Sequence, residues 1–436
     1  MNKRNKIKTG YIQTEIGRIP KEWKVVTLDE IVKEDKFAIV DGPFGTQLHS
    51  NEYMDSGIPL IRVNNINKDG LFNFEDLVYI SEIKFEKLKR SAVYPGDILL
   101  AKTGATIGKV TIFPGKFEKG LIASSCAKIS IDENKADIIY IFYFILSDLG
   151  YKQILASSTG ATRPTINLTP ISKIIIFLPP FPEQQKIAEI LSTVDQAIEK
   201  VDDSIAKTER LKKGLMQELL TKGIGHKEFK DTEIGRIPKE WEVVRLGEVV
   251  DINKESRDPN REFPEREFLY IDIDSIENGT GVIKAAKTLI GKKAPSRARR
   301  VIHYNDVIMS TVRPYLKAFA IVPREYDAQI CSTGFAVLTC KERILPSYLL
   351  YTLFSNYVIS QCNRMMVGGQ YPALNNSQVE KIKLPLPSLP EQQKIAEILS
   401  TVDKRLVLLR NKKEKMERVK KGLMNDLLTG KRRVKV

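Results

Sequence analysis

The sequence predicts a mixed α/β protein built from two diverged α/β bodies and two long antiparallel coiled-coil helices, with an internal pseudo-twofold repeat. Three observations predict this architecture. The phrase PEQQKIAEILSTVD occupies residues 182–195 and returns unchanged at residues 390–403. The phrase TEIGRIPKEW occupies residues 14–23 and returns at residues 232–241. Short apolar runs bounded by glycine and proline, which are typical of strands, lie between these phrases.

Each copy of the longer phrase opens a helical pattern that runs to a glycine, Gly223 or Gly430. Apolar residues recur there at steps of three and four, the heptad spacing of a coiled coil. They are Ile187, Leu191, Val194, Ile198, Val201, Ile205, Leu215 and Leu219 in the first copy, and Ile395, Leu399, Val402, Leu406, Leu409, Met416 and Leu423 in the second. We expect the apolar seam to weaken at Lys212, Lys413 and Lys420. Roughly 38 residues at about 1.5 Å each give a rod of about 57 Å.

A helix of this length with one apolar stripe needs a partner in water. The simplest partner for each helix is the other helix. One body precedes the first helix and another follows it, so the second helix must run back along the first. The pair is therefore expected to be antiparallel. The alternative is that each pattern marks an ordinary packing or dimerisation helix.

The repeated phrases divide the chain into seven predicted segments. They are an N-terminal segment (1–23), a first α/β domain (24–180), a central spacer helix (181–223), a linker with the repeated phrase (224–241), a second α/β domain (242–388), a C-terminal spacer helix (389–430) and a basic tail (431–436).

The two bodies follow one order of elements with different residues. The first has a strand at Ile58–Val63, a turn at Gly96 and Asp97, a glycine-rich loop at Thr103–Lys109, a helix at Ile138–Ser147, a loop at Gly160–Asn167 and a strand at Ile174–Leu178. In the second, Phe268–Ile273, Tyr304–Met309 and Gly368–Asn375 correspond to the first strand, the turn and the last loop. The helix starts are identical while the bodies have diverged. This contrast suggests that one shared scaffold holds two bodies with different binding surfaces.

The composition indicates a polyanion as partner. The chain has 69 Lys and Arg against 54 Asp and Glu, a net charge of +15. Its four cysteines are scattered without a CxxC pair, which suits free thiols in a reducing cytoplasm. No apolar run reaches the roughly 18 residues of a membrane span, and we expect a cytoplasmic protein. The three histidines have no metal-ligand spacing.

The motifs of catalytic chemistry are absent from the sequence. Gly104–Lys109 is one residue short of a phosphate-binding loop and is followed by Val110. The sequence has no NPPY- or DPPY-type tetrapeptide of amino-methyltransferases, no GxGxxG after a strand, and neither HExxH nor GxSxG. We therefore predict no catalytic residue and no metal site on this chain.

Basic and amide side chains in the loops are the candidates for contact with DNA. Arginine and glutamine can make paired hydrogen bonds to guanine and adenine edges, and lysine and arginine neutralise phosphates. The candidates are Lys102, Thr103, Thr106, Lys109, Arg163, Arg297, Arg299, Arg300, Arg313, Lys317, Gln370 and Tyr371. The alternative for the basic stretch at residues 291–300 is a solvated loop, and for the other residues it is the capping of turns.

Polar residues repeated at both helix starts are the candidates for docking a partner. Packing of a helix pair needs only the apolar seam, yet polar positions recur as well. They are Gln184, Gln185, Lys186 and Glu189, with Gln392, Gln393, Lys394 and Glu397 in the second copy. We interpret them as two equivalent docking sites for two copies of one partner. A recent duplication that has not yet diverged is the alternative.

The chain resembles the specificity subunit of type I restriction–modification enzymes over nearly its whole length. The resemblance lies in GRIPKEW (17–23 and 235–241), DGPFG (41–45), PGDILLAKTGATIGK (95–109), GATRPTIN (160–167), LPPFPEQQKIAEIL (178–191) and LPLPSLPEQQKIAEIL (384–399). The second half departs from the pattern, because it lacks DGPFG and Asn305 replaces the glycine of PGD.

The resemblance implies a subunit without activity of its own in a DNA adenine methyltransferase and type I restriction endonuclease complex. Two target-recognition domains would each read one half of a bipartite target in double-stranded DNA. The helical spacers would separate these domains and dock two methylation subunits, and two restriction/translocation subunits would complete the nuclease. S-adenosylmethionine, ATP and Mg would then bind to the partner subunits.

The sequence therefore predicts a DNA-recognition subunit with an asymmetric target, since the two bodies differ. Two other functions are kept as alternatives. A self-contained methyltransferase or nuclease would bind S-adenosylmethionine or cleave DNA unaided. A protein scaffold would join two protein partners and bind all duplexes with equal weakness.

Overall fold

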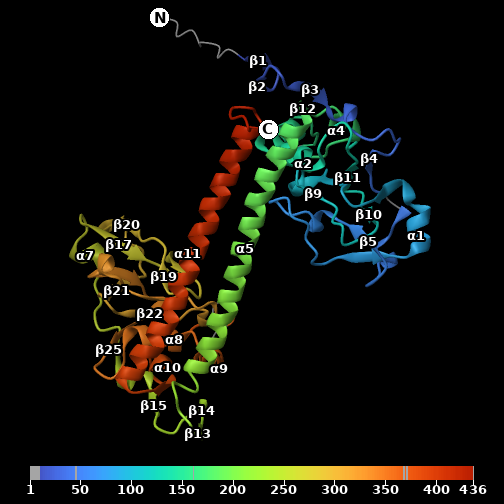
Figure 1. Ribbon diagram of the computed structural model, residues 1–436. Helices are drawn as coiled ribbons and strands as arrows, with labels where there is room; N and C mark the ends of the chain where they lie inside the picture. Colours follow the sequence, from blue (N-terminus) through green and yellow to red (C-terminus); the bar gives the residue numbers. More distant parts are fainter. Residues whose placement is uncertain (1–9, 45–46, 161, 367–368, 370–371, 436) are drawn as a thin grey trace, which may run out of the picture. The chain divides into compact units, whose positions relative to one another are not determined.

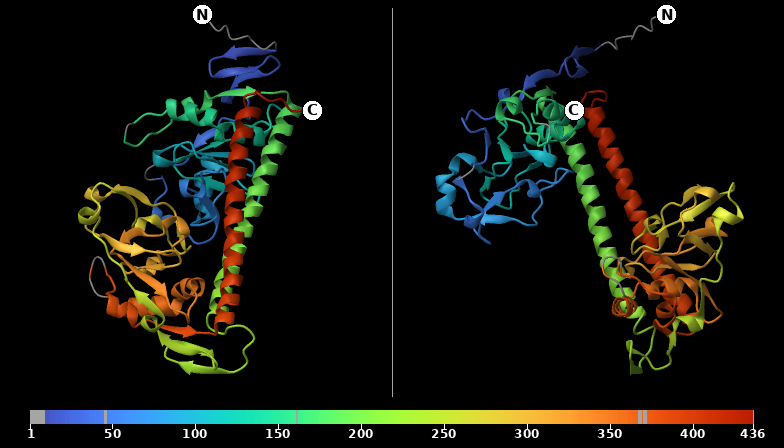
Figure 2. Two further views of the ribbon diagram at one scale, coloured as in Figure 1. Left: turned by 90° about the vertical axis from the view of Figure 1, so that its left-hand side faces the viewer. Right: turned by 180° about the vertical axis from the view of Figure 1, so that it is seen from behind.

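The computed structural model describes residues 10–44, 47–160, 162–366, 369 and 372–435. The chain forms two compact units. Unit 1 comprises the residues up to Asp202 and those from Lys412 onward, and unit 2 comprises Asp203–Asn411. Each unit therefore combines one α/β body with one half of each long helix (Figure 1, with views from two other sides in Figure 2).

The long helices α5 (Phe181–Leu219) and α11 (Leu389–Leu427) have 39 residues each. Both begin at the predicted residue and end a few residues before the glycines that were expected to stop them. Pro182 and Pro390 suit the first turn, where no backbone N–H is needed, and Glu183 and Glu391 place negative charge at the helix start.

The two helices pair antiparallel in each unit. In unit 1, Lys420 lies 2.6 Å from Asp195 and Lys413 lies 2.7 Å from Asp202. In unit 2, Lys212 lies 2.5 Å from Asp403 and Arg410 lies 2.8 Å from Glu209. Within each unit, the residue numbers of the paired side chains increase along α5 as they decrease along α11, so the two helices run antiparallel. The seam lysines, which we expected to weaken the pairing, each meet an aspartate of the opposite helix.

The body of unit 1 contains two four-stranded sheets. One has the order β6 (Val78–Ile80), β5 (Ile58–Ile61), β10 (Gly120–Ile122), β7 (Ala92–Val93). The other has the order β4 (Ile39–Asp41), β11 (Cys126–Ile129), β8 (Ile98–Ala101), β9 (Val110–Ile112). The strands β3 (Lys24–Thr27) and β12 (Ile175–Leu178) pair antiparallel beside them, and β1 (Tyr11–Thr14) and β2 (Gly17–Pro20) form a hairpin.

The body of unit 2 repeats this topology. Its sheets have the orders β20 (Lys287–Ile290), β17 (Glu267–Ile271), β24 (Gln329–Ser332), β21 (Ala298–Ile302) and β16 (Val250–Ile252), β25 (Phe335–Cys340), β22 (Val307–Ser310), β23 (Phe319–Ile321). The pairs β15 (Glu242–Arg245) with β26 (Lys383–Leu386) and β13 (Phe229–Thr232) with β14 (Gly235–Pro238) match those of unit 1. A small ribbon of β18 (Ile276–Glu277) and β19 (Val282–Ile283) is added.

Short helices complete each body. Unit 1 has α1 (Glu82–Lys87), α2 (Ile138–Leu146), α3 (Asp148–Ala156) and α4 (Leu168–Ser172), and unit 2 has α6 (Leu246–Val249), α7 (Pro259–Glu262), α8 (Pro346–Leu353), α9 (Asn356–Met365) and α10 (Asn376–Glu380). Among the described residues no single helix meets the length and hydropathy needed to cross a membrane, and the bent pair α2–α3 meets them only jointly.

Each body holds the start of one long helix and the end of the other. In unit 1, Ile187 and Leu191 of α5 share a core with Leu427 and Leu428 at the end of α11. In unit 2, Ile395 and Leu399 of α11 share a core with Leu219 and Leu220 at the end of α5. A buried leucine or isoleucine contributes about 1.5–3 kcal/mol, so these contacts fix the helix pair in both bodies.

The two repeated phrases meet in the structure. Trp23 of the shorter phrase is buried and donates its indole N–H to Glu183 of the longer phrase at 3.1 Å. Trp241 and Glu391 make the equivalent bond in unit 2 at 3.0 Å. A second bond joins body and helix, since Tyr143 donates to Asp195 at 2.7 Å and Tyr351 donates to Asp403 at 2.8 Å. These shared bonds explain why both phrases are retained.

Candidate nucleic-acid interface

Two loops lie against each other in the body of unit 1. The loop that follows β8 and the loop that precedes α4 form a bridge between Thr103 and Thr165. Gly104 N–H donates to the Pro164 carbonyl at 2.8 Å, and Ile166 N–H donates to the Lys102 carbonyl at 3.0 Å. The loops predicted to contact DNA are therefore held side by side by backbone bonds.

The body of unit 2 holds its two corresponding loops by the same three interactions. Val312 and Ala373 form the bridge. Arg313 N–H donates to the Pro372 carbonyl at 3.0 Å, and Leu374 N–H donates to the Thr311 carbonyl at 2.9 Å. The backbone of the paired loops is thus common to both bodies, while their side chains differ.

Three left-handed glycines of unit 1 are replaced by larger residues in unit 2. Gly96, Gly104 and Gly108 have φ of +91°, +67° and +83°. At the corresponding positions Asn305, Arg313 and Lys317 have φ of +70°, +48° and +57°. Because a side chain in this region costs roughly 1–2 kcal/mol, Arg313 and Lys317 are strained where glycine would fit freely.

Lys317 has a contact inside the protein that accounts for it. Its ammonium donates to the Phe354 carbonyl at 2.9 Å, at the C-terminal end of α8. Burial lowers the pKa of Lys317 below its ordinary value, and Lys212 nearby adds to this. Lys317 therefore caps a helix end, and its contact with DNA stays a prediction.

Lys102 also lies inside the protein. It is buried and pairs with Asp41, itself buried, at 2.9 Å. Asp41 pairs in addition with Arg90. The pair joins the DGPFG and KTGAT motifs of unit 1. The buried ion pair gives Lys102 a role inside the protein, and its contact with DNA stays a prediction.

The other candidates of these loops lie at different depths. Arg163 is exposed and its side chain packs beside Gly104, while Thr103, Thr106 and Lys109 are half-buried. The Thr106 hydroxyl donates to the Thr103 carbonyl at 3.0 Å, a turn-stabilising bond. The candidates Gln370 and Tyr371 lie outside the described residues.

The basic cluster of unit 2 lies at strand β21 and the residues just before it. Arg297 is exposed, and no partner of its side chain is found among the described residues. Arg299 donates to Asp258 at 2.8 Å. Burial lowers the pKa of the half-buried Arg300, whose buried Nε lacks a hydrogen-bond partner within the described part of the chain. Of the three arginines, Arg297 is the one directed to solvent.

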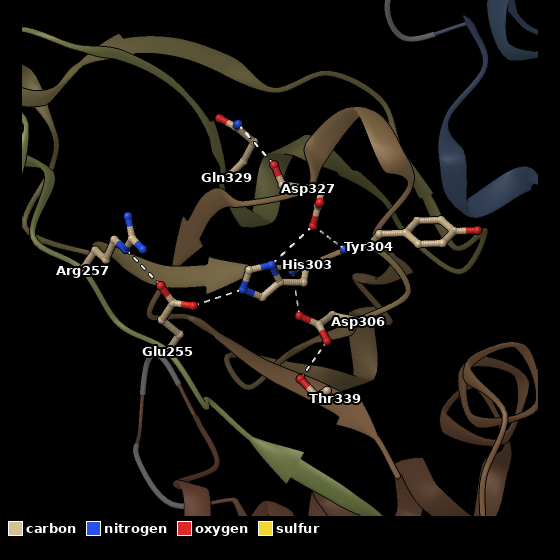
Figure 3. Close-up of polar contacts among 8 residues, drawn as sticks. All are labelled: Glu255, Arg257, His303, Tyr304, Asp306, Asp327, Gln329 and Thr339. Carbon is tan, nitrogen blue, oxygen red and sulfur yellow. Dashed lines mark hydrogen bonds and ion pairs between the residues drawn. The ribbon is translucent and has the colours of Figure 1, made fainter. Parts of the chain in front are cut away.

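A histidine clamp lies beside this cluster (Figure 3). The His303 imidazole lies between Glu255 at 3.1 Å and Asp327 at 3.3 Å. The hydrogen bond to Glu255 raises the pKa of His303 above its ordinary value, with Asp327 adding to the shift and burial opposing it. The same bond to His303 is the largest cause that lowers the pKa of Glu255.

The clamp holds a segment against the arginine-bearing strand. Val301 N–H donates to the Glu255 carbonyl at 3.2 Å, and Arg257 N–H donates to the Arg299 carbonyl at 2.9 Å. The imidazole bonds two carboxylates and is not hydrogen-bonded to a hydroxyl or thiol in the described structure. Its geometry therefore suits positioning of β21 and lacks the arrangement of an activated nucleophile.

The predicted docking residues divide into buried and exposed positions. Gln184 is buried, accepts from Asp137 N–H at 2.9 Å and donates to the Pro179 carbonyl. Gln392 is buried and bonds the backbone at Leu345 and Pro387 in the same way. These two glutamines tie the helix start to its body, which explains their recurrence without a partner, and their docking role stays a prediction.

The exposed members are three residues at each helix start. Gln185, Lys186 and Glu189 lie on the surface of α5, with Lys186 paired to Glu189 at 2.7 Å. Gln393, Lys394 and Glu397 lie on the surface of α11, with Gln393 bonded to Glu397 at 2.8 Å. Their docking role stays a prediction.

The cysteines show no sign of reactivity. Cys126, Cys331 and Cys362 are buried and all four thiols are free. Burial raises the pKa of Cys126, Cys340 and Cys362 to about 12, which leaves the thiols protonated and unreactive. Within the described residues no cluster of His, Cys, Asp and Glu could hold a metal ion.

The fold and its paired loops define a duplicated-domain binding protein with a strong basic charge. A family model described as the type I restriction modification DNA specificity domain matches residues 20–208 and again residues 238–418. The chain therefore belongs to the family of type I restriction–modification specificity subunits and carries two target-recognition domains.

Individual relatives agree with the family match. The chain is 30% identical over 428 residues to the type I restriction enzyme MjaVIII specificity subunit of Methanocaldococcus jannaschii, covering 96% of this chain and 95% of that protein. It is 24% identical over 406 residues to the EcoDI specificity subunit of Escherichia coli, covering 87% and 81%. A crystal structure of the type I system S subunit from M. genitalium has the same fold, with a TM-score of 0.55 at 16% identity over 93% of this chain and 96% of that chain.

Proposed function

We propose that each recognition domain reads one half of a bipartite, asymmetric DNA target. The observation that carries the proposal is the difference between the paired loops. Identical backbone bonds hold Gly104 in one body and Arg313 in the other, so one frame presents two different surfaces. Arginine in a groove can bond both acceptors of a guanine edge, a contact that glycine cannot make.

The two long helices set the gap between the half-sites and dock two methylation subunits in this proposal. Two restriction/translocation subunits then complete the nuclease. The chain contributes recognition and no chemistry of its own, and S-adenosylmethionine, ATP and Mg bind to the partners. The complex acts in the cytoplasm. The names of the relatives, all specificity subunits of type I restriction enzymes, support this assignment.

The test is co-expression of the chain with a methylation subunit, followed by genome-wide mapping of methylated adenines. One motif with two specified halves and an unspecified gap is the expected result. A variant in which a copy of residues 24–180 replaces residues 242–388 is expected to methylate a target with two related halves. Methylation without a bipartite motif, or cleavage by this chain alone, would contradict the proposal.

Arg297 is the residue through which we expect phosphate contact in the second domain. Arg297→Ala is expected to weaken binding of all duplexes alike and to reduce the slope of log affinity against log salt by about 1. Arg261→Ala is the control, because Arg261 is exposed on the same body but pairs with Asp258. If the slope of log affinity against log salt is unchanged in Arg297→Ala, this arginine does not contact phosphate.

A further inference from the structure

A second repeat lies in the C-terminal halves of the two long helices. Residues 207–221 read KTERLKKGLMQELLT and residues 415–429 read KMERVKKGLMNDLLT, with eleven of fifteen residues identical. The first stretch belongs to unit 2 and the second to unit 1. For each residue that is identical in the two stretches, its contacts show whether packing within the chain accounts for it.

The chain itself explains the two leucines at the end of each stretch and one of its lysines. Leu219 and Leu220, like Leu427 and Leu428, are buried in the cores of their bodies. The side chain of Lys212 pairs with Asp403, and the side chain of Lys420 pairs with Asp195.

The glycine of each stretch has no explanation inside the chain. Gly214 and Gly422 lie within α5 and α11, and both are exposed. A Cβ atom added at either position would meet nothing within 4 Å among the described residues. Glycine is unfavourable inside a helix because its backbone loses more conformational freedom on folding than that of alanine. A glycine at the same position of both helices, with nothing packed on it, therefore needs another explanation.

The neighbours of each glycine form one exposed helix face. Positions i, i+4 and i+7 of a helix lie on the same side. In unit 2 these are Lys207, Leu211 and Gly214, and Leu211 is 54% exposed. In unit 1 they are Lys415, Val419 and Gly422, with Val419 56% exposed.

Both faces carry the same charge. Exposed Arg210 and Lys213 flank the first glycine, and exposed Arg418 and Lys421 flank the second. Arg418 pairs at the surface with Glu414 and Lys421 lies 3.5 Å from Asp148, and carboxylates of a partner would replace these solvent-screened pairs. Each stretch from lysine to glycine contains four basic residues and one acidic residue. The glycine leaves room for a partner to approach the helix closely. The exposed apolar side chain suits an apolar group of that partner, and the basic residues around it suit carboxylates.

We propose that these two glycine faces are docking sites for two copies of one protein partner. The partner presents an apolar side chain that lies over Gly214 or Gly422, flanked by acidic side chains that pair with the arginine and lysine. The inference rests on the proposed function, in which that partner is the methylation subunit. It places the contact in the second half of each helix, away from the helix starts.

A protein is favoured over DNA as the occupant because Leu211 and Val419 stand at the centre of each face. Phosphates would gain nothing from an apolar side chain there, whereas burial of a leucine or valine against a protein removes apolar area from water.

The test compares substitutions at the glycines in the full chain. Gly214→Ala with Gly422→Ala is expected to raise the Tm of the chain alone, since alanine favours the helix. Gly214→Leu with Gly422→Leu is expected to weaken binding of the purified methylation subunit at least tenfold, measured by calorimetry. Ala206→Leu, at an exposed small residue of the same helix, is the control and should change the affinity less than twofold.

The single substitutions give a readout that a purely structural role would not produce. Gly214→Leu alone should leave one copy of the methylation subunit bound instead of two, measured by native mass spectrometry, while the chain stays folded. Undiminished two-copy assembly with both leucines would overturn the inference. A changed salt slope of DNA binding with intact assembly would show that the faces bind DNA and would likewise overturn it. Failure of the unaltered chain to bind the methylation subunit would instead contradict the proposed function.

Discussion

Arg313 is the residue at which the two recognition domains differ most informatively. Its backbone has φ +48° and ψ +55°, a left-handed conformation that glycine adopts at the corresponding position of unit 1. Lys317, four residues later, also has a positive φ, and its side chain caps a helix end. Arg313 therefore invites a test of whether its side chain serves recognition.

We expect Arg313→Gly to preserve the fold and to damage reading of one half-site. Glycine fits the left-handed region, which offsets the loss of the contacts of the arginine side chain, while loss of a bidentate base contact should cost about 1–3 kcal/mol of discrimination. Lys317→Ala is the matched control and should lower the Tm, because it removes the bond to Phe354 without relieving the left-handed backbone. Methylation of target variants in the assembled complex measures the discrimination. Equal discrimination by Arg313→Gly and the unaltered chain would exclude a base contact.

His303 gives the second unit a stability that depends on pH. Its folded pKa is raised chiefly by the bond to Glu255, so its contribution is fully present below the ordinary value of about 6.5. That contribution is lost as the pH rises through the folded pKa. The Tm of His303→Gln should therefore fall below that of the parent at pH 6 and approach it at pH 8.5, by calorimetry.

At the scale of elements, the helix pair is fixed by aspartates as well as by its apolar seam. Asp403 accepts from the Tyr351 hydroxyl and pairs with Lys212, and both charged side chains are mostly buried. Asp202 pairs with Lys413 in a more exposed place. The loss of folding stability should therefore be larger when the charge of Asp403 is removed than when that of Asp202 is removed.

We expect Asp403→Asn to lower the stability of unit 2 by about 1–2 kcal/mol, a fall in Tm of roughly 2–6 °C. Asp202→Asn should cost roughly 0.5 kcal/mol or less, because solvent screens that pair. Thermal unfolding of the two variants at low and high salt measures both. Equal costs at the two positions would show that burial does not set the strength of these pairs.

The sequence predicts the elements better than it predicts the surfaces. Heptad spacing, Pro182 and Pro390 are local signals, and both helices begin where those signals place them. Whether Lys102 faces solvent depends on Asp41, which lies 61 residues earlier. The recurrence of Gln184 and Gln392 indicates a shared role, yet only the structure shows that both side chains bond to the body.

At the scale of the whole molecule, the residues that join body to helix are the same in both repeats, whereas the recognition loops differ. Trp23 and Trp241, missed as functional in the sequence, stand in the repeated phrase and join it to the helix start. The aspartates at positions 195 and 403 likewise lie within the longer phrase and bond both a tyrosine and a lysine. The recognition loops lie outside these phrases, so they can change without loss of the frame.

The proposed function predicts that helix length sets the unspecified gap of the target. Insertion of one heptad after Asp203 in α5 and one after Asn411 in α11 keeps the apolar seam in phase. Each helix then gains about 10 Å, at about 1.5 Å per residue. At about 3.4 Å per base pair the gap should grow by roughly three base pairs, while both specified halves stay unchanged. Genome-wide mapping of methylated adenines measures the gap directly. A control chain with the heptad in α5 alone should lose pairing and methylation, and an unchanged gap in the doubly extended chain would show that the helices do not set it.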